Sequence, residues 1–247
     1  MNKSKYLINK TFKLRALRYN LESGWMKDPE LLNSLVPCPH GLGKMLDVCT
    51  GTGLVAKHGF SKSWEVTALD CSIDMLNQIS DRSSISIIHG NAEALPFTED
   101  TFDLVTCRQG LQYLNIPKAL HEFYRVSRAE IRLAHIILEK SDDKHFWQKY
   151  FRIASPGRRH IFNPGEISKI CREIGMTIKH EKIYYNRGTL LGAIKHLNPK
   201  LVQDVKYHFE QAPDWWKKKY DLRPLPFGDF EYNHRWEIII ISKKHSQ

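Results

Sequence analysis

The stretch from Leu46 to Gly53, LDVCTGTG, constrains the fold more than any other part of the sequence. An apolar segment leads into the acid Asp47, and two glycines follow at alternate positions, Gly51 and Gly53. Glycine lacks a Cβ and adopts positive φ readily, so the backbone of such a loop can approach a ligand closely. Taken alone, the pattern fits a tight turn, a nicotinamide site or another nucleoside site.

A second apolar segment that ends in an acid follows at the spacing of a doubly wound sheet. It reads WEVTALD and runs from Trp64 to Asp70, about twenty residues beyond the glycine loop. In such sheets the acid at the end of the second strand faces ribose hydroxyls. The two segments together predict a parallel sheet that binds a nucleoside at its carboxyl edge.

The glycine loop lacks the fingerprint of a dinucleotide site. Cys49 stands at the first glycine of that fingerprint, and Ala56 stands at the third. The acid Asp47 precedes the glycines, a position that suits a cationic ligand better than a pyrophosphate. The loop therefore indicates a positively charged nucleoside in place of NAD.

The whole arrangement resembles the class I S-adenosylmethionine-dependent methyltransferases, whose motif I has the form acid-x-Gly-x-Gly-x-Gly. The resemblance continues in order through the first half of the chain, and several of the matching segments recur together in the branch that contains ubiquinone and menaquinone biosynthesis methyltransferases. The segments are LDCSIDML (69–76), GNAEALPF (90–97), TFDLVTCRQGLQYL (101–114) and KALHEFYRV (118–126).

The resemblance implies S-adenosylmethionine as the cofactor and, carried over residue by residue, assigns its contacts. Asp47 and the glycine loop would line the methionine end and the sulfonium, and Gln109 would face the methionine moiety. Asp70 would accept hydrogen bonds from both ribose hydroxyls. Asn91, where the family commonly has Asp, would meet the adenine edge. The predicted cofactor residues are Asp47, Cys49, Thr50, Gly51, Thr52, Gly53, Asp70, Cys71, Ser72, Met75, Asn91, Ala92, Glu93, Arg108 and Gln109. No metal site is expected.

The alternation of segments predicts one α/β domain over residues 1–247, with a Rossmann-like, doubly wound sheet of seven strands. The resemblance makes the last two strands an antiparallel pair. We expect a helical N-terminal segment (1–43), a core (44–187), an insertion between the last two strands (188–232), and a last strand with a tail (233–247). The expected strands lie near 44–49, 64–70, 84–89, 102–107, 130–139, 176–185 and 235–243.

The insertion is rich in aromatic residues. Val202, Val205 and Phe209 have helical spacing, and Trp215 and Trp216 follow them. The segment is a candidate lid over the acceptor pocket; the alternative is a helix that packs on the sheet edge, and the sequence leaves both open.

The candidates for catalysis are His160 and Tyr113. An imidazole suits proton removal near neutral pH, and His160 follows the fifth expected strand. The chain has twelve histidines, so a surface or packing role for His160 is the common alternative. Tyr113 would orient an acceptor or form part of the pocket wall, as would Tyr19. Arg158 and its neighbour would pair with an acidic substrate or face solvent.

The net charge of +10 raises the question of an anionic partner, namely RNA, an acidic carrier protein or an acidic metabolite. The basic residues are spread along the chain, which is typical of a solvated surface. The segment from Cys107 to Gly110 lacks the Asn/Asp-Pro-Pro-aromatic pattern of adenine-N6 methyltransferases. A nucleic-acid partner is therefore not expected, although the charge leaves it open.

The sequence predicts a cytoplasmic protein. No apolar run approaches the ~20 residues of a membrane span, the N-terminus lacks a secretory signal, and the five cysteines form no CxxC pair. We predict a methyltransferase that acts on a small, anionic or aromatic metabolite. The alternatives are a methyltransferase of RNA or a carrier protein, and a non-catalytic homologue or partner subunit that only binds the cofactor. The sequence predicts no oligomeric state.

Overall fold

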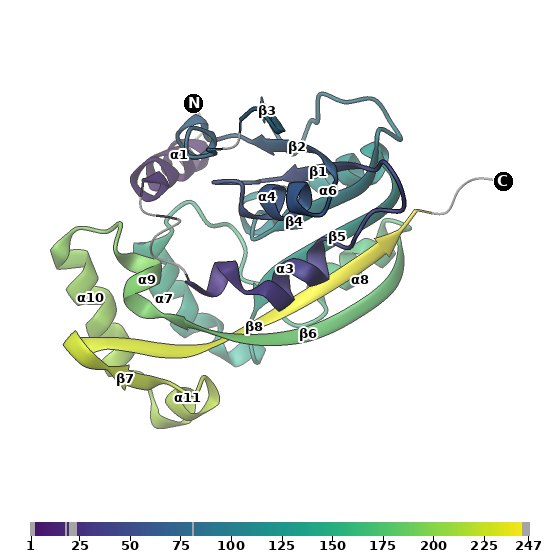
Figure 1. The fold of residues 1–247 in the computed structure, drawn as a ribbon. Coiled ribbons are helices and arrows are strands. Elements are labelled where there is room, and N and C mark those ends of the chain that lie inside the picture. Colours follow the sequence, from purple (N-terminus) through teal and green to yellow (C-terminus); the bar gives the residue numbers. More distant parts are fainter. Residues whose placement is uncertain (1–2, 18, 20–23, 81, 244–247) are drawn as a thin grey trace.

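The computed structural model describes residues 3–17, 19, 24–80 and 82–243, and helices cover both faces of one central sheet (Figure 1). The strands are β1 (Lys44–Val48), β2 (Glu65–Asp70), β3 (Ile85–His89), β4 (Phe102–Arg108), β5 (Ser127–Ile137), β6 (Thr177–Thr189), β7 (Arg223–Leu225) and β8 (Asp229–Ser242). The α-helices are α1 (Lys3–Ala16), α3 (Pro29–Leu35), α4 (Leu54–Ser61), α5 (Ile73–Leu76), α6 (Ile116–Val126), α7 (Lys144–Ala154), α8 (Glu166–Glu173), α9 (Leu190–Ile194), α10 (Pro199–Glu210) and α11 (Asp214–Lys219). Short 3₁₀ turns are η1 (Gly24–Lys27), η2 (Leu111–Tyr113), η3 (Ser141–Asp143) and η4 (Pro226–Gly228).

The sheet has the order β3-β2-β1-β4-β5-β8-β6. Strands β1 to β5 pair in parallel, and β8 lies antiparallel between β5 and β6. This topology confirms the doubly wound α/β fold with its terminal antiparallel pair. In the described part of the chain the sheet has eight strands, one more than expected, because the insertion itself contributes β7, which pairs with β8.

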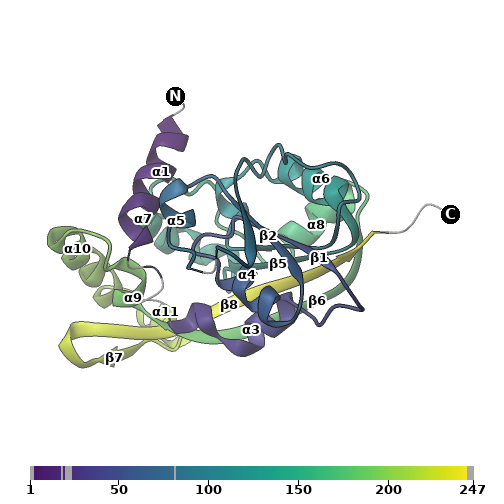
Figure 2. The same ribbon diagram turned by 45° about the horizontal axis from the view of Figure 1, so that its top comes forward.

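The two terminal strands are longer than the sequence indicates. β6 and β8 contain 13 and 14 residues and stay paired as far as Thr189 and Glu231. Helices α9 to α11 and strand β7 gather at the far end of these strands (Figures 1 and 2). The segment between the two strands is therefore 190–228, and the expected insertion of 188–232 begins and ends inside paired strands.

Three groups of buried side chains stabilise this arrangement. Leu31 and Val55 belong to the core between the sheet and helices α3 and α4, and Phe123 belongs to the core on the opposite face. A third core, with Trp147 and Trp216, joins the insertion to α7. The insertion thus shares a hydrophobic core with α7, and burial of the aromatic rings in this core stabilises it.

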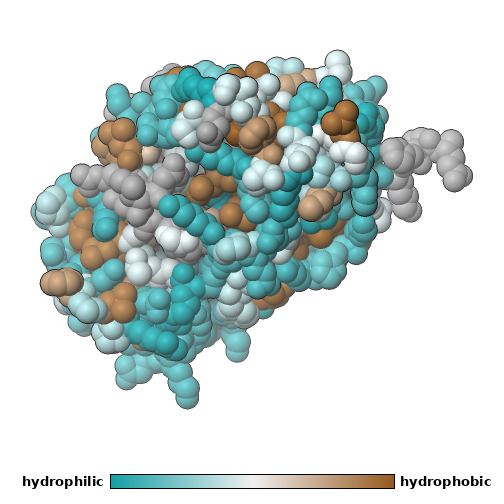
Figure 3. Space-filling model, in the orientation of Figure 1, coloured by the Kyte–Doolittle hydropathy of each residue, from teal (hydrophilic) through white to brown (hydrophobic). Residues whose placement is uncertain are grey.

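The surface is mixed in polarity. On the face shown in Figure 3, hydrophobic residues form small, separate groups among hydrophilic ones. Among the described residues, no helix is long and apolar enough to cross a membrane. Residues 244–247 of the expected tail, and residues 1–2, 18 and 20–23 of the expected helical segment, lie outside the described residues.

Candidate active site

The carboxyl ends of β1, β2 and β4 meet at one edge of the sheet and border a cavity of about 90 Å³, which we call the edge pocket. Helix α1 lies beside α5 near this edge (Figure 2). The pocket is lined by Ile8, Phe12, Tyr19, Asp47, Cys49, Thr50, Gly51, Thr52, Leu54, Val55, Asp70, Cys71, Met75, Arg108, Gln109, Gly110, Tyr113 and Leu114.

The two glycines of the loop after β1 have different surroundings. Gly51 has φ +58°, and a Cβ added there would meet no atom within 4 Å. A Cβ added to Gly53, with φ +80°, would lie 3.0 Å from Cγ1 of Ile79. Gly51 therefore exposes bare backbone to the open pocket, whereas Gly53 permits close packing where α4 begins.

Asp47 is a buried acid on the floor of the edge pocket. Its two carboxylate oxygens accept hydrogen bonds from the hydroxyls of Thr50, at 2.6 Å, and Thr106, at 2.8 Å. Burial raises the pKa of Asp47 to about 6, although both hydroxyls act in the opposite direction. A positively charged ligand beside this acid would favour its ionised form.

Asp70 forms hydrogen bonds with two loops of the edge pocket. Oδ2 accepts a hydrogen bond from the backbone N–H of Gly51, at 2.9 Å, and Oδ1 accepts one from the backbone N–H of Ser72, at 2.8 Å. Burial raises the pKa of Asp70. The backbone of Cys71 also donates to this carboxylate. Because a carboxylate offers about four acceptor sites, three backbone donors leave Asp70 capacity to bind a ribose hydroxyl while it holds the loops.

Gln109 lies where the edge pocket meets a second cavity. Its backbone has φ +54°, a left-handed conformation that is costly for glutamine. Its side-chain Oε1 is buried and has no hydrogen-bond partner among the described residues, and the same holds for Oε1 of Gln112. A buried acceptor without a partner is unfavourable, so a ligand with donor groups would stabilise both side chains.

The second cavity, which we call the aromatic pocket, has a volume of about 100 Å³. It shares Phe12, Tyr19, Gln109 and Tyr113 with the edge pocket. Its other lining residues are Arg15, Gln112, Ile136, Ile137, Leu138, Trp147, Tyr150, Phe151, Ala154, Ser155, Arg158, Ile161, Ala193, Tyr220, Tyr232, Asn233, His234 and Arg235. The two cavities are therefore neighbours that meet at four side chains.

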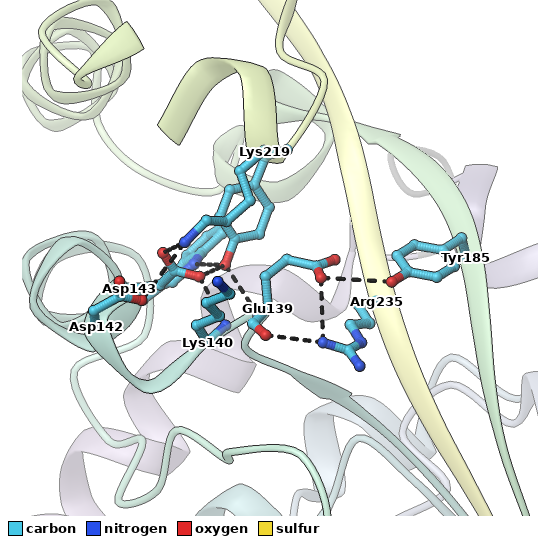
Figure 4. Close-up of polar contacts among 9 residues, drawn as sticks. Glu139, Lys140, Asp142, Asp143, Tyr185, Lys219 and Arg235 are labelled. Carbon is cyan, nitrogen blue, oxygen red and sulfur yellow. Dashed lines mark hydrogen bonds and ion pairs between the residues drawn. The ribbon is translucent and has the colours of Figure 1, made fainter. Parts of the chain in front are cut away.

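The insertion reaches the aromatic pocket through Ala193 and Tyr220. Two hydrogen bonds fix Tyr220: its hydroxyl donates to the fully buried carboxylate of Asp143, at 2.9 Å, and accepts from Nε1 of Trp147, at 3.0 Å. Nζ of Lys219 lies 2.7 Å from the other oxygen of Asp143 (Figure 4). These contacts join α11 to the beginning of α7 and hold one wall of the pocket in place.

The structure brings ten of the fifteen predicted cofactor residues to the edge pocket. The other five lie outside its lining and are Gly53, Ser72, Asn91, Ala92 and Glu93. The hydroxyl of Ser72 caps α5, Oδ1 of Asn91 accepts from the N–H of Glu93, and Oε1 of Glu93 accepts from the N–H of Asn115. The assignment of these residues to the cofactor stays a prediction.

The structure separates the two candidates for catalysis. Tyr113 lines both pockets, and its hydroxyl forms a 2.6 Å hydrogen bond with the hydroxyl of Ser155. His160 lines neither pocket and instead borders an outer hollow next to the aromatic pocket. Its ring nitrogen Nε2 lies 3.1 Å from the carbonyl oxygen of Leu114, and its backbone N–H donates to Gln112. His160 is therefore a poor candidate for a catalytic base.

Several lining residues were not singled out from the sequence. Ile8 and Phe12 reach the edge pocket from α1, and Trp147, Tyr150 and Phe151 reach the aromatic pocket from α7. Their helical spacing is the only signal that the sequence carries for them, and it predicts a buried helix face without saying what that face covers.

The chain is similar to proteins of known family. A family model described as a methyltransferase domain matches residues 45–130. The demethylmenaquinone methyltransferase of Lysinibacillus sphaericus is 30% identical over 158 residues, which cover 60% of this chain and 66% of that protein. The one of Anoxybacillus flavithermus is 34% identical over 136 residues, which cover 48% of this chain and 56% of that protein. The chain thus spans between about half and two thirds of the length of these relatives.

Solved structures share the fold. The YcgJ protein of Bacillus subtilis is 18% identical with a TM-score of 0.76, over 90% of this chain and 100% of that chain. Phosphoethanolamine N-methyltransferase 2 of Haemonchus contortus, in complex with S-adenosyl-L-methionine, is 18% identical with a TM-score of 0.56, over 98% of this chain and 59% of that chain. These structures show the shared fold. The match to the methyltransferase-domain model and to the demethylmenaquinone methyltransferases, together with the acid-led glycine loop and the strand order, assigns the chain to the class I S-adenosylmethionine-dependent methyltransferases, whose cofactor is S-adenosylmethionine.

Proposed function

We propose that this protein transfers the methyl group of S-adenosylmethionine to a small aromatic or anionic metabolite held in the aromatic pocket. The observation that carries the proposal is the junction of the two cavities at Phe12, Tyr19, Gln109 and Tyr113. The sulfonium of the cofactor makes its methyl carbon electrophilic. The protein's own task is then to hold the acceptor in line at near-attack distance and to exclude water.

The residues around the junction suit this task. Asp47 and the bare backbone of Gly51 favour a cationic nucleoside, and Asp70 offers acceptors for ribose hydroxyls. Trp147 and Tyr150 offer apolar ring faces that would bury a flat acceptor. Tyr113, with its hydroxyl fixed by Ser155, would orient the acceptor from the shared wall. The name of the curated relatives, demethylmenaquinone methyltransferase, also supports a small-molecule acceptor.

Methyl transfer would be tested with S-adenosylmethionine labelled in its methyl group and a panel of phenols, aromatic acids and amines. We expect label in at least one acceptor, and loss of turnover in Gly51→Val, because the new side chain would occupy the open space over the loop. Gly41→Val is the matched control, since Gly41 also has positive φ (+84°) and open space around it but lies outside both pockets.

Each substitution to valine should lower the free energy of unfolding by about 1–3 kcal/mol through backbone strain. Only Gly51→Val should also weaken binding of S-adenosylhomocysteine, by about tenfold or more. Equal cofactor affinities in the two variants would contradict this assignment of the loop. Cofactor binding without turnover on any acceptor would favour a non-catalytic homologue. Saturable binding to tRNA or to an acidic carrier protein in moderate salt would favour a macromolecular acceptor.

Affinity for S-adenosylhomocysteine should rise with pH through the titration of Asp47. Its pKa of about 6 leaves the acid mostly protonated at low pH, when it cannot attract the ligand's ammonium group. We expect a dissociation constant about tenfold larger at pH 5 than at pH 7, and little change above that. At pH values between the pKa of Asp47 in the unfolded chain and its higher pKa in the folded protein, the folded protein retains a proton that the unfolded chain has lost. The contribution of Asp47 to the stability of the ligand-free protein therefore falls as pH rises through this range.

Calorimetric titrations across this pH range provide the measurement. Asp47→Asn, which cannot ionise, should bind weakly and without this pH dependence. A constant dissociation constant for the unsubstituted protein between pH 5 and 7 would mean that Asp47 does not face the charged part of the ligand.

A further inference from the structure

Three arginines line the aromatic pocket, and two of them have no acidic partner among the residues that the structure describes. Arg235 donates to Oε2 of Glu139, at 3.2 Å, and to its carbonyl oxygen, at 2.9 Å (Figure 4). Arg15 and Arg158 form no ion pair with a carboxylate anywhere in residues 3–17, 19, 24–80 and 82–243, and the lining of the pocket contains no Asp or Glu. The pocket therefore has an excess of positive charge.

Arg158 is held by contacts that leave much of its guanidinium available. Its Nε donates to the carbonyl oxygen of His160, at 2.8 Å, and its Cζ lies 4.0 Å from the ring centroid of Phe151. The Cζ of Arg15 lies 5.0 Å from the ring centroid of Tyr19. Aromatic faces attract a guanidinium, but they do not replace the hydrogen bonds that an oxyanion would accept.

The surroundings of Arg158 oppose its charge. Burial lowers the pKa of Arg158 to about 10, and the nearby charge of Arg15 acts in the same direction. His234 and His196 also belong to this region, and burial lowers the pKa of His234 to about 3 and that of His196 to about 4. Both histidines are thus neutral near pH 7 and neither adds to nor offsets the charge. An anionic ligand beside Arg158 would offset both the cost of burying its charge and its repulsion from Arg15, and would favour the charged guanidinium.

The approach to Arg158 from solvent is also basic. The outer hollow, of about 290 Å³, shares Phe151, Ser155, Arg158 and Ile161 with the aromatic pocket. Lys144, Arg152 and Arg159 line it as well. Glu166 is the one acidic residue in its lining among the described residues, and it accepts hydrogen bonds from the backbone and side chain of Asn163. A cleft lined by one sign of charge raises the local concentration of ligands of the opposite sign.

We propose that the methyl acceptor is an aromatic acid whose carboxylate is bound by Arg158, with Arg15 supplying further positive charge, an inference that rests on the proposed methyl transfer. The flat fork of a guanidinium matches a carboxylate through two parallel hydrogen bonds. With the carboxylate at Arg158, the ring of the acceptor lies among Trp147, Tyr150 and Phe151 and extends toward Gln109 and Tyr113. Charge and ring are thus recognised by different parts of one pocket.

The test compares aromatic acids with their uncharged amides, because the two have nearly the same shape. The protein is first saturated with S-adenosylhomocysteine, and benzoate, 4-hydroxybenzoate and 1-naphthoate are then titrated in a calorimeter beside the corresponding amides. We expect at least one acid to bind about tenfold or more tightly than its amide. Arg158→Gln should abolish that preference, and Arg158→Lys should keep part of it because the charge stays while the fork is lost.

Arg172→Gln is the matched control, since Arg172 is an exposed arginine on α8 that lines neither pocket. It should leave the preference unchanged. The inference is overturned if no acid binds better than its amide, or if the preference survives in Arg158→Gln with an intact melting curve. If Arg158→Gln fails to fold, the comparison of acids with amides and Arg158→Lys still decide the matter. Failure of S-adenosylhomocysteine to bind would overturn the proposed function as well, whereas its binding without acid preference overturns only the acceptor class.

Discussion

Replacement of Trp216 by alanine is expected to lower the free energy of unfolding by about 3–5 kcal/mol. The indole is fully buried, and its ring centroid lies 4.0 Å from that of Phe146 and 4.4 Å from that of Tyr220. Truncation would remove these contacts and leave a cavity that the fixed wall around Asp143 cannot fill by relaxing. Denaturant unfolding measures the change.

Trp215→Ala is the matched control for this prediction. Trp215 precedes Trp216 in α11 and has 53% of its surface exposed. Nζ of Lys219 lies over its ring, 4.6 Å from the ring centroid. Its loss should cost no more than about 1 kcal/mol. Affinity for S-adenosylhomocysteine in the folded Trp216→Ala protein should stay within about threefold, because the edge pocket lies outside this core. Equal destabilisation by both substitutions would show that the insertion is not packed as the structure has it.

Asp70→Ala is expected to weaken binding of S-adenosylhomocysteine by about 2–4 kcal/mol. The substitution removes the charged acceptor proposed for the ribose hydroxyls. It also frees the backbone N–H groups of Gly51 and Ser72, which Asp70 orders at the edge pocket. The buried strand β2 should still form, since its other side chains are unchanged.

Two further variants separate charge from position in this test. Asp74→Ala removes the same charge from the first turn of α5, outside the edge pocket, and should leave affinity nearly unchanged. Asp70→Asn keeps one oxygen acceptor and should lie between the alanine variant and the unsubstituted protein. If Asp70→Ala shows an intact melting curve and an unchanged dissociation constant, Asp70 does not bind the ribose.

The sequence located strands β1 to β4 within one or two residues of their observed bounds. β1 and β4 are buried along most of their length and are correspondingly rich in apolar residues. The edge strand β3 is only partly buried, and its three isoleucines mark it in the sequence. β8 begins at Asp229, before its expected start at 235. The sequence missed this first half of the strand because its polar and apolar residues alternate and form no continuous apolar run. β5 begins at Ser127, directly after α6, where no turn residue marks the boundary.

The candidate site was predictable where it follows the ends of strands. Asp47, Gly51 and Asp70 lie next to apolar runs, so local sequence places them at one edge of a parallel sheet. The aromatic pocket was not predictable, because Phe12 and Trp147 reach it through the packing of α1 and α7, which depends on contacts between distant segments. The place of His160 was not predictable for the same reason: its backbone N–H donates to Gln112 and its ring nitrogen Nε2 lies 3.1 Å from the carbonyl oxygen of Leu114, and its role in catalysis stays a prediction.

A crystal structure with bound S-adenosylhomocysteine is the most direct test of the account. We predict adenosine in the edge pocket, the ribose at Asp70, and the sulfur at the junction formed by Gln109 and Tyr113, facing the aromatic pocket. A ligand bound elsewhere, or one whose sulfur points away from the aromatic pocket, would contradict the proposed route of methyl transfer.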